Sequence, residues 1–150
     1  MKSKKINILF ICKHNIFRSK VAEAYFKKIN KNKNITVESA GFIKGAWMSK
    51  PLPVIRIINK QKFAAEKRGF KLKIQSKELS IDLLRKQDLI IIISDDLKNI
   101  FNEKEYMKKN LKVRTWKIKD VKHTNYTEKK LDYTIDQIMK KVDKLVKELS

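Results

Sequence analysis

Residues 6–26 read INILFICKHNIFRSKVAEAYF, and this stretch decides the fold. Its first part, from Ile6 to Ile11, is an apolar run typical of a strand that is buried on both faces of a parallel sheet. Its last part repeats apolar residues at helical spacing after Ser19, a residue type that often caps a helix N-terminus. We therefore predict a strand that ends at Cys12, a tight loop, and a helix capped by Ser19.

The rest of the chain continues this alternation of strands and helices. The patterns predict strands at 35–37, 89–93 and 112–116, and helices at 54–67, 80–84 and 131–149. Gly69 lies where a C-terminal cap is expected. Alternating elements predict an α/β fold in three layers, with a four-stranded parallel sheet, helices on both faces and right-handed crossovers. The length of 150 residues, without internal repeats or linkers, fits a single domain over residues 1–150.

The chain is strongly basic, with 37 Lys and Arg residues against 16 Asp and Glu residues and a formal net charge of +21. Such a charge attracts nucleic acids, anionic surfaces and phosphorylated substrates. Lysine is spread along the whole chain, however, and no basic tail stands apart from the folded pattern. We interpret the charge as a solvated surface, and we expect nucleic acid to bind only through nonspecific charge.

Three features favour a cytoplasmic protein that does not enter a membrane. No apolar run approaches the ~18 residues of a membrane helix, and the basic N-terminus is followed by a short apolar run that we interpret as the first strand, not as a signal peptide. Cys12 is the only cysteine, so it cannot form an internal disulfide. A free thiol favours a reducing compartment.

Residues 12–19, CKHNIFRS, lie at the carboxyl end of the first strand, where parallel α/β sheets bind ligands. Arg18 follows Cys12 after five residues, and Arg is suited to a two-pronged contact with phosphate oxygens. The following helix points its positive end at the same place, which also favours the thiolate of Cys12. Backbone N–H groups that can surround a tetrahedral anion come from Lys13, His14, Asn15, Ile16 and Phe17.

This pattern predicts an anion-binding catalytic loop. Asn15 supports it, because Asn is a residue type that adopts the left-handed backbone conformation needed in tight loops. In the alternative interpretation, Cys12 is a small buried hydrophobic residue at a strand end and Arg18 is a surface residue.

The segment ILFICKHNIFRSKVAEAYF resembles the signature of the low-molecular-weight protein tyrosine phosphatase family, and the order of the remaining elements is similar to that family's as well. The resemblance implies a parallel sheet in strand order 2-1-3-4. It also implies that Cys12 is the nucleophile, that Arg18 clamps the phosphate, and that Ser19 donates a hydroxyl hydrogen bond to the thiolate. By the same resemblance, Asn15 shapes the loop and is braced by Ser39.

The family places a general acid in a loop after the fourth strand, where this chain has Asp120. The alternative for Asp120 is a solvated loop aspartate. Asp95 and Asp96 follow the third strand, and we interpret them as helix-capping residues.

Several positions depart from the family pattern. Val121 and Lys122 stand where the family usually has Pro and an aromatic residue, so the preference for aryl substrates stays open. Trp47 is a candidate for one wall of the substrate site, with ordinary packing as the alternative. Phe17 stands where many relatives have a second cysteine, so an oxidised Cys12 lacks that disulfide partner.

The two histidines are weaker candidates. His14 replaces a common Gly of the family, and a His-Asn pair at this position also occurs in arsenate reductases that share the fold. The alternative for His14 is a loop residue that faces solvent. We expect His123 to be exposed.

These observations predict a cysteine-dependent phosphatase that hydrolyses phosphotyrosine or a related phosphate monoester through a thiophosphate-enzyme intermediate. The substrate is a phosphorylated protein or a small phosphate ester, the product is inorganic phosphate, and no metal or organic cofactor is implied. One alternative is an arsenate reductase that uses a low-molecular-weight thiol, because no further cysteine is present to pass on a disulfide. The other is a basic nucleic-acid-binding protein.

Overall fold

In the computed structural model, the described residues are 4–13, 15, 17–42, 52–73, 75–94, 111–119 and 127–150. Strands and helices alternate along the chain, as the sequence predicts. The elements are β1 (Ile6–Cys12), α1 (Arg18–Ile29), β2 (Ile35–Gly41), α2 (Leu52–Lys67), α3 (Ile81–Arg85), β3 (Leu89–Ile93), β4 (Lys112–Trp116) and α4 (Glu128–Leu149).

The four strands form one parallel sheet in the order β2-β1-β3-β4, which confirms the predicted topology. Cys12 is the last residue of β1 and is paired with Gly41 at the end of β2. On its other side β1 pairs with β3, where Ile11 is opposite Ile92. The strand order reverses around β1, so its carboxyl end is at the place where such sheets bind ligands.

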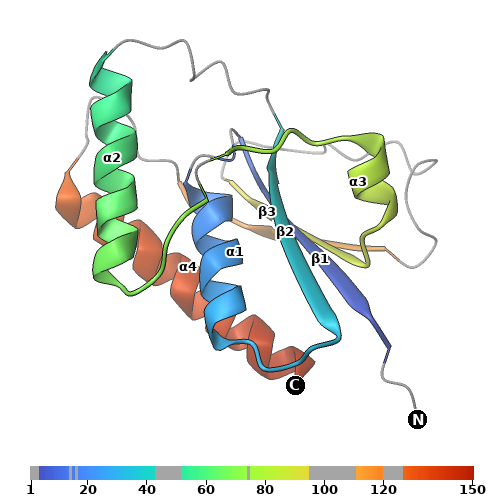
Figure 1. Cartoon of the computed structure of the whole chain (residues 1–150). Coiled ribbons are helices and arrows are strands. Elements are labelled where there is room, and N and C mark those ends of the chain that lie inside the picture. Colours follow the sequence, from blue (N-terminus) through green and yellow to red (C-terminus); the bar gives the residue numbers. More distant parts are fainter. Residues whose placement is uncertain are drawn as a thin grey trace.

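The layers are those expected of an α/β sheet (Figure 1). Helices α1, α2 and α4 lie on one face of the sheet, and α3 lies on the other. Alternate residues of β1 divide between the two cores, because successive side chains of a strand point to opposite faces. Ile8 and Phe10 pack with residues of α1 and α4, whereas Leu9 and Ile11 pack with Leu83 of α3.

Two predicted helix ends and the predicted apolar stripe of the last helix agree with the structure. Ser80 caps α3, because its side chain accepts a hydrogen bond from the backbone N–H of Leu83 at 3.1 Å. Gly69 follows α2 with a φ of +85°, the left-handed conformation of a C-terminal cap. The final helix buries the predicted stripe of Leu131, Ile135, Ile138, Val142 and Leu145.

The prediction that Ser19 caps α1 is wrong. The helix begins at Arg18, its N-cap residue is Phe17, and no side chain caps it. Ser19 lies inside the first turn, and its hydroxyl oxygen bonds instead with Cys12 and Asn15. The hydroxyl oxygen of Ser19 is therefore engaged in tertiary contacts and does not accept a hydrogen bond from the backbone of the helix N-terminus.

Within the described part of the chain, none of the helices combines the length and the apolar character needed to cross a bilayer.

Candidate active site

Cys12 is buried, with 3% of its surface exposed, but its sulfur has polar partners. Sγ lies 3.0 Å from Ser19 Oγ and accepts a hydrogen bond from the backbone N–H of Asn15 at 3.2 Å. The backbone carbonyl of Cys12 accepts from Phe42, which fixes the end of β1 against β2. The sulfur is therefore held in a polar loop, unlike that of a cysteine that only fills space in a core.

Asn15 connects this loop to three other segments. Its φ of 53° is left-handed, as the sequence predicts. Its side-chain nitrogen donates to Ser19 Oγ at 2.7 Å and to Ser39 Oγ at 2.9 Å, so the brace expected from the resemblance is present. Its side-chain oxygen accepts from the backbone N–H of Lys77 at 2.8 Å, and its carbonyl accepts from Ser76 Oγ at 2.7 Å.

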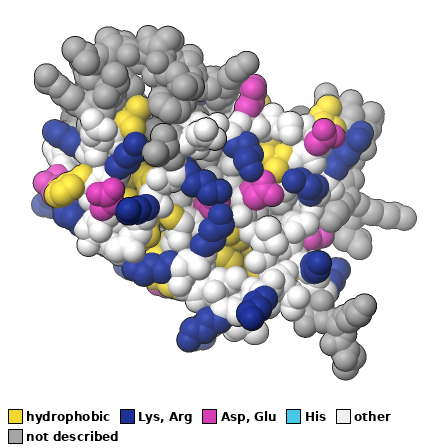
Figure 2. Space-filling view, viewed as in Figure 1, with side chains coloured by type: hydrophobic (Ala, Val, Ile, Leu, Met, Phe, Trp, Pro, Cys, Tyr) yellow, Lys and Arg dark blue, Asp and Glu magenta, His cyan; other side chains and the backbone are white. Residues whose placement is uncertain are grey.

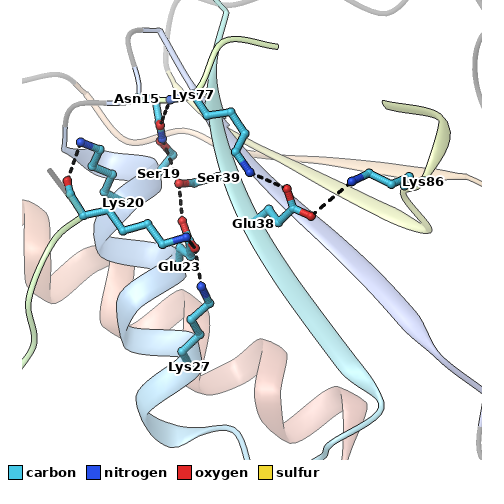
Figure 3. Close-up of polar contacts among 10 residues, drawn as sticks. Asn15, Ser19, Lys20, Glu23, Lys27, Glu38, Ser39, Lys77 and Lys86 are labelled. Atoms are coloured by element: carbon cyan, nitrogen blue, oxygen red, sulfur yellow. Dashed lines mark hydrogen bonds and ion pairs between the residues drawn. The ribbon is translucent and has the colours of Figure 1, made fainter. Parts of the chain in front are cut away.

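The direction of these hydrogen bonds shows whether Cys12 Sγ acts as a hydrogen-bond donor or as an acceptor. Because the oxygen of Ser19 accepts from Asn15, its single proton is available for Cys12 Sγ. This arrangement suits a thiolate, which can only accept. On the other side of Asn15, Ser39 accepts from the amide and donates to Glu23 Oε1 at 2.5 Å. Figure 3 shows Asn15, Ser19, Ser39 and Glu23 of this network between α1 and β2.

Glu23 anchors the far end of the network, and sequence reasoning did not assign it to the site. Its side chain is almost fully buried. Glu23 Oε2 forms ion pairs with Lys27 Nζ at 2.6 Å and with Lys73 Nζ at 2.7 Å. Burial alone would raise the pKa of Glu23, but hydrogen bonds from Lys27, Lys73 and Ser39 more than offset it and hold the pKa below its ordinary value of 4.5. The available signal was its spacing of four residues from Ser19, which places both on one face of α1.

Replacing Glu23 by Gln should lower the free energy of unfolding at pH 7 by about 1–3 kcal/mol, because the amide accepts the lysine hydrogen bonds less strongly. The folded pKa of Glu23 is depressed, so its contribution is present above the unfolded pKa and is lost as pH falls through the folded pKa. The difference between variant and wild type, measured by urea unfolding, should therefore shrink as the pH falls below the ordinary value of 4.5.

Glu148→Gln is the control for that measurement, because Glu148 forms an exposed ion pair with Arg114. Its effect should stay below about 1 kcal/mol. Equal stability of wild type and Glu23→Gln at pH 7 would contradict the anchoring role.

Arg18 is also buried, with 3% of its surface exposed, so the alternative of a surface arginine is excluded. Its guanidinium donates from Nη1 to the backbone carbonyl of Ile118 at 2.8 Å. Ile118 follows β4 at the carboxyl edge of the sheet, and Asp120 comes two residues later in the sequence. Arg18 thus connects the first turn of α1 to the segment that leads to Asp120.

The structure brings Cys12, Asn15 and Ser19 into one hydrogen-bonded group and keeps Arg18 buried at the same edge of the sheet. Phe17 is buried and packs in the main core, while Lys13 is partly exposed. The other predicted residues lie outside the described residues; these are His14, Ile16, Trp47, Asp95, Asp96, Asp120, Val121, Lys122 and His123.

The family model for "Low molecular weight phosphotyrosine protein phosphatase" matches residues 7–150. The chain belongs to this family. The match extends from β1 through α4, so the resemblance seen at residues 8–26 is confirmed over almost the whole chain. No curated protein sequence matches the chain significantly.

Solved structures of several proteins share the fold of this low molecular weight phosphatase family member. An arsenate reductase from Archaeoglobus fulgidus is 24% identical, with 93% of this chain and 98% of that chain covered and a TM-score of 0.63. The YwlE arginine phosphatase from Geobacillus stearothermophilus is 17% identical, with coverage of 96% and 92% and a TM-score of 0.72. A protein tyrosine phosphatase from Entamoeba histolytica is 20% identical, with 97% of each chain covered and a TM-score of 0.67.

Proposed function

We propose that this protein is a phosphatase that uses Cys12 to hydrolyse phosphate monoesters. The observation that carries the proposal is the position of Cys12 Sγ at the carboxyl end of β1, with Ser19 Oγ at 3.0 Å and the Asn15 N–H at 3.2 Å. These groups stabilise a sulfur anion directly before the N-terminus of α1, which favours negative charge. Membership of the phosphatase family supports the same chemistry.

The reaction we propose has two steps. In the first, Cys12 Sγ attacks phosphorus, the P–S bond forms as the bond to the leaving oxygen breaks, and Asp120 gives that oxygen its proton. In the second, Asp120 takes a proton from water as the water attacks phosphorus. The P–S bond then breaks, and inorganic phosphate leaves while the thiolate is restored.

The phosphoryl group needs stabilisation in both steps, because charge develops on its equatorial oxygens. We assign this role to Arg18 and to backbone N–H groups of the loop from Lys13 to Phe17, with His14, Asn15 and Ile16 between them. The burial of Arg18 supports the assignment, because a guanidinium shielded from water interacts more strongly with an anion. The hydrogen bond to Ile118 fixes its orientation.

Phosphotyrosine or a related ester, on a protein or on a small molecule, is the substrate we propose, with Trp47 as one wall of the site. The structures that share the fold include a tyrosine phosphatase, an arginine phosphatase and an arsenate reductase, so the leaving group has to be determined by assay. We further propose that residues 1–150 act as one domain in the cytoplasm.

The decisive experiment compares wild type and Cys12→Ser on aryl phosphate, alkyl phosphate and arsenate in parallel. Hydrolysis of a phosphate ester by wild type alone supports the proposal. Arsenate reduction dependent on a low-molecular-weight thiol, without ester hydrolysis, would replace it by the reductase function. Absence of both activities in folded wild type would contradict both.

Asp120→Asn should slow substrates with basic leaving groups by about 10²–10⁴-fold, because these depend most on protonation. An activated aryl phosphate should be affected less. The wild type should also lose activity on the alkaline side of its pH profile, and this limb should weaken in the variant. The measurement is kcat against leaving-group basicity, with Asp82→Asn on exposed α3 as the control. Equal slowing of all substrates would exclude Asp120 as the acid.

A further inference from the structure

A second basic site lies on the outer side of α1, where a pocket of about 220 Å³ opens between this helix and residues 70–73. Its ionisable lining consists of four lysines and one glutamate, and Figure 2 shows more Lys and Arg than Asp and Glu side chains on this face of the molecule. The proposed reaction uses none of these lysines. The lining residues are Lys20, Glu23, Ala24, Lys27, Phe70, Lys71 and Lys73.

The single negative charge of Glu23 does not neutralise the positive charges of the four lysines. Glu23 forms ion pairs with both Lys27 and Lys73. The side chains of these lysines are 48% and 58% exposed, so they remain accessible from the pocket. Lys71 has no hydrogen-bond or ion-pair partner among the residues that the structure describes. With Lys20 protonated, the pocket therefore holds three more positive than negative charges.

Lys20 is the buried member of the group. Only 5% of its surface is exposed, and its ammonium donates to the backbone carbonyl of Lys73 at 2.7 Å. Burial, followed by the charge of Lys62 on α2, lowers its pKa to about 8; Lys73 acts in the same direction, whereas Cys12 and Glu23 oppose the shift. The charged form of Lys20 is thus disfavoured first by burial and then by repulsion from Lys62, and an anion in the pocket would favour it.

We propose that this pocket binds a small, free phosphate-type anion, at a site separate from the Cys12 loop. Lysine ammonium groups bind phosphate oxygens as point charges, and here they come from both sides of the pocket. The volume suits an ion of one or two phosphoryl groups. Glu23 competes for the same lysines, so anion binding at this site is opposed by the carboxylate that anchors Ser39 and Asn15.

The test is an NMR titration of ¹⁵N-labelled protein with inorganic pyrophosphate at fixed ionic strength. Amide signals of Ala24, Lys71 and Lys73 should shift saturably, whatever happens at the catalytic loop. Lys71→Ala should weaken this binding about 5-fold, the effect of one nearby point charge. Lys140→Ala, which removes an exposed lysine of α4, should leave it unchanged. Glu23→Gln should strengthen it.

A second titration uses sulfate, whose charge is constant between pH 7 and pH 9. Affinity should fall across this range as Lys20 loses its proton, and Lys20→Met should abolish the dependence. The proposal is overturned if pyrophosphate shifts only catalytic-loop signals, or if Lys71→Ala and Lys140→Ala weaken binding equally. It is also overturned if sulfate binding by wild type does not change with pH, or if a phosphoserine peptide binds the pocket more tightly than pyrophosphate.

Discussion

Cys12→Ser is expected to lower phosphate-ester turnover by at least about 10⁴-fold, because a serine hydroxyl at neutral pH is a far weaker nucleophile than a thiolate. Binding of inorganic phosphate should remain largely intact. The proposed anion cradle consists of backbone N–H groups and Arg18, none of which is altered. Serine also keeps an acceptor close to Ser19 and to the Asn15 N–H.

Two measurements separate the chemical effect from damage to the fold. Phosphate affinity by calorimetry and the urea unfolding midpoint should both stay close to wild type in Cys12→Ser. Turnover similar to wild type in a folded variant would exclude Cys12 as the nucleophile. Loss of both turnover and phosphate binding would mean that the sulfur supports the structure of the loop.

Arg18→Lys should reduce kcat/KM by about 10²–10³-fold, comparable to the loss of a donor that stabilises transition-state charge. An ammonium is a point charge and cannot make the paired contacts of a planar guanidinium. The loss should be accompanied by weaker phosphate binding, because the proposed clamp acts on both the ground state and the transition state.

Arg114→Lys is the matched control, because its guanidinium is partly exposed and pairs with Glu148 on the surface. Its kinetics should equal those of the wild type. Near-normal kcat/KM in Arg18→Lys would show that the buried guanidinium serves the structure through Ile118 and does not clamp phosphate.

The fold was largely predictable, because buried parallel strands have a strong local signal. Residues 89–93, LIIII, are predicted and observed as one strand, since all five side chains are buried between two layers. Helix ends were less predictable. Ser80 and Ser19 are equally good caps by sequence, but only Ser80 caps a helix, since Ser19 is taken by Asn15 from the adjoining loop.

The residues of the candidate site that lie close together in the sequence could be predicted, and those that are joined only by the fold could not. Cys12, Asn15 and Arg18 lie in one short segment, and its spacing indicated an anion-binding loop. Glu23 was missed because its partners Ser39 and Lys73 belong to distant parts of the sequence. The roles of Asp120 and Trp47 stay predictions from the resemblance.

The hydrogen bonds of Asn15 determine when the candidate active site forms during folding. The side-chain amide of Asn15 joins the loop after β1 to Ser39 on β2 and to the backbone at Lys77, segments that are far apart in the sequence. Formation of α1 alone cannot orient Ser19 toward the sulfur. The site should thus form only after these distant segments have come together, and the amide proton of Lys77 should exchange with solvent whenever the site opens.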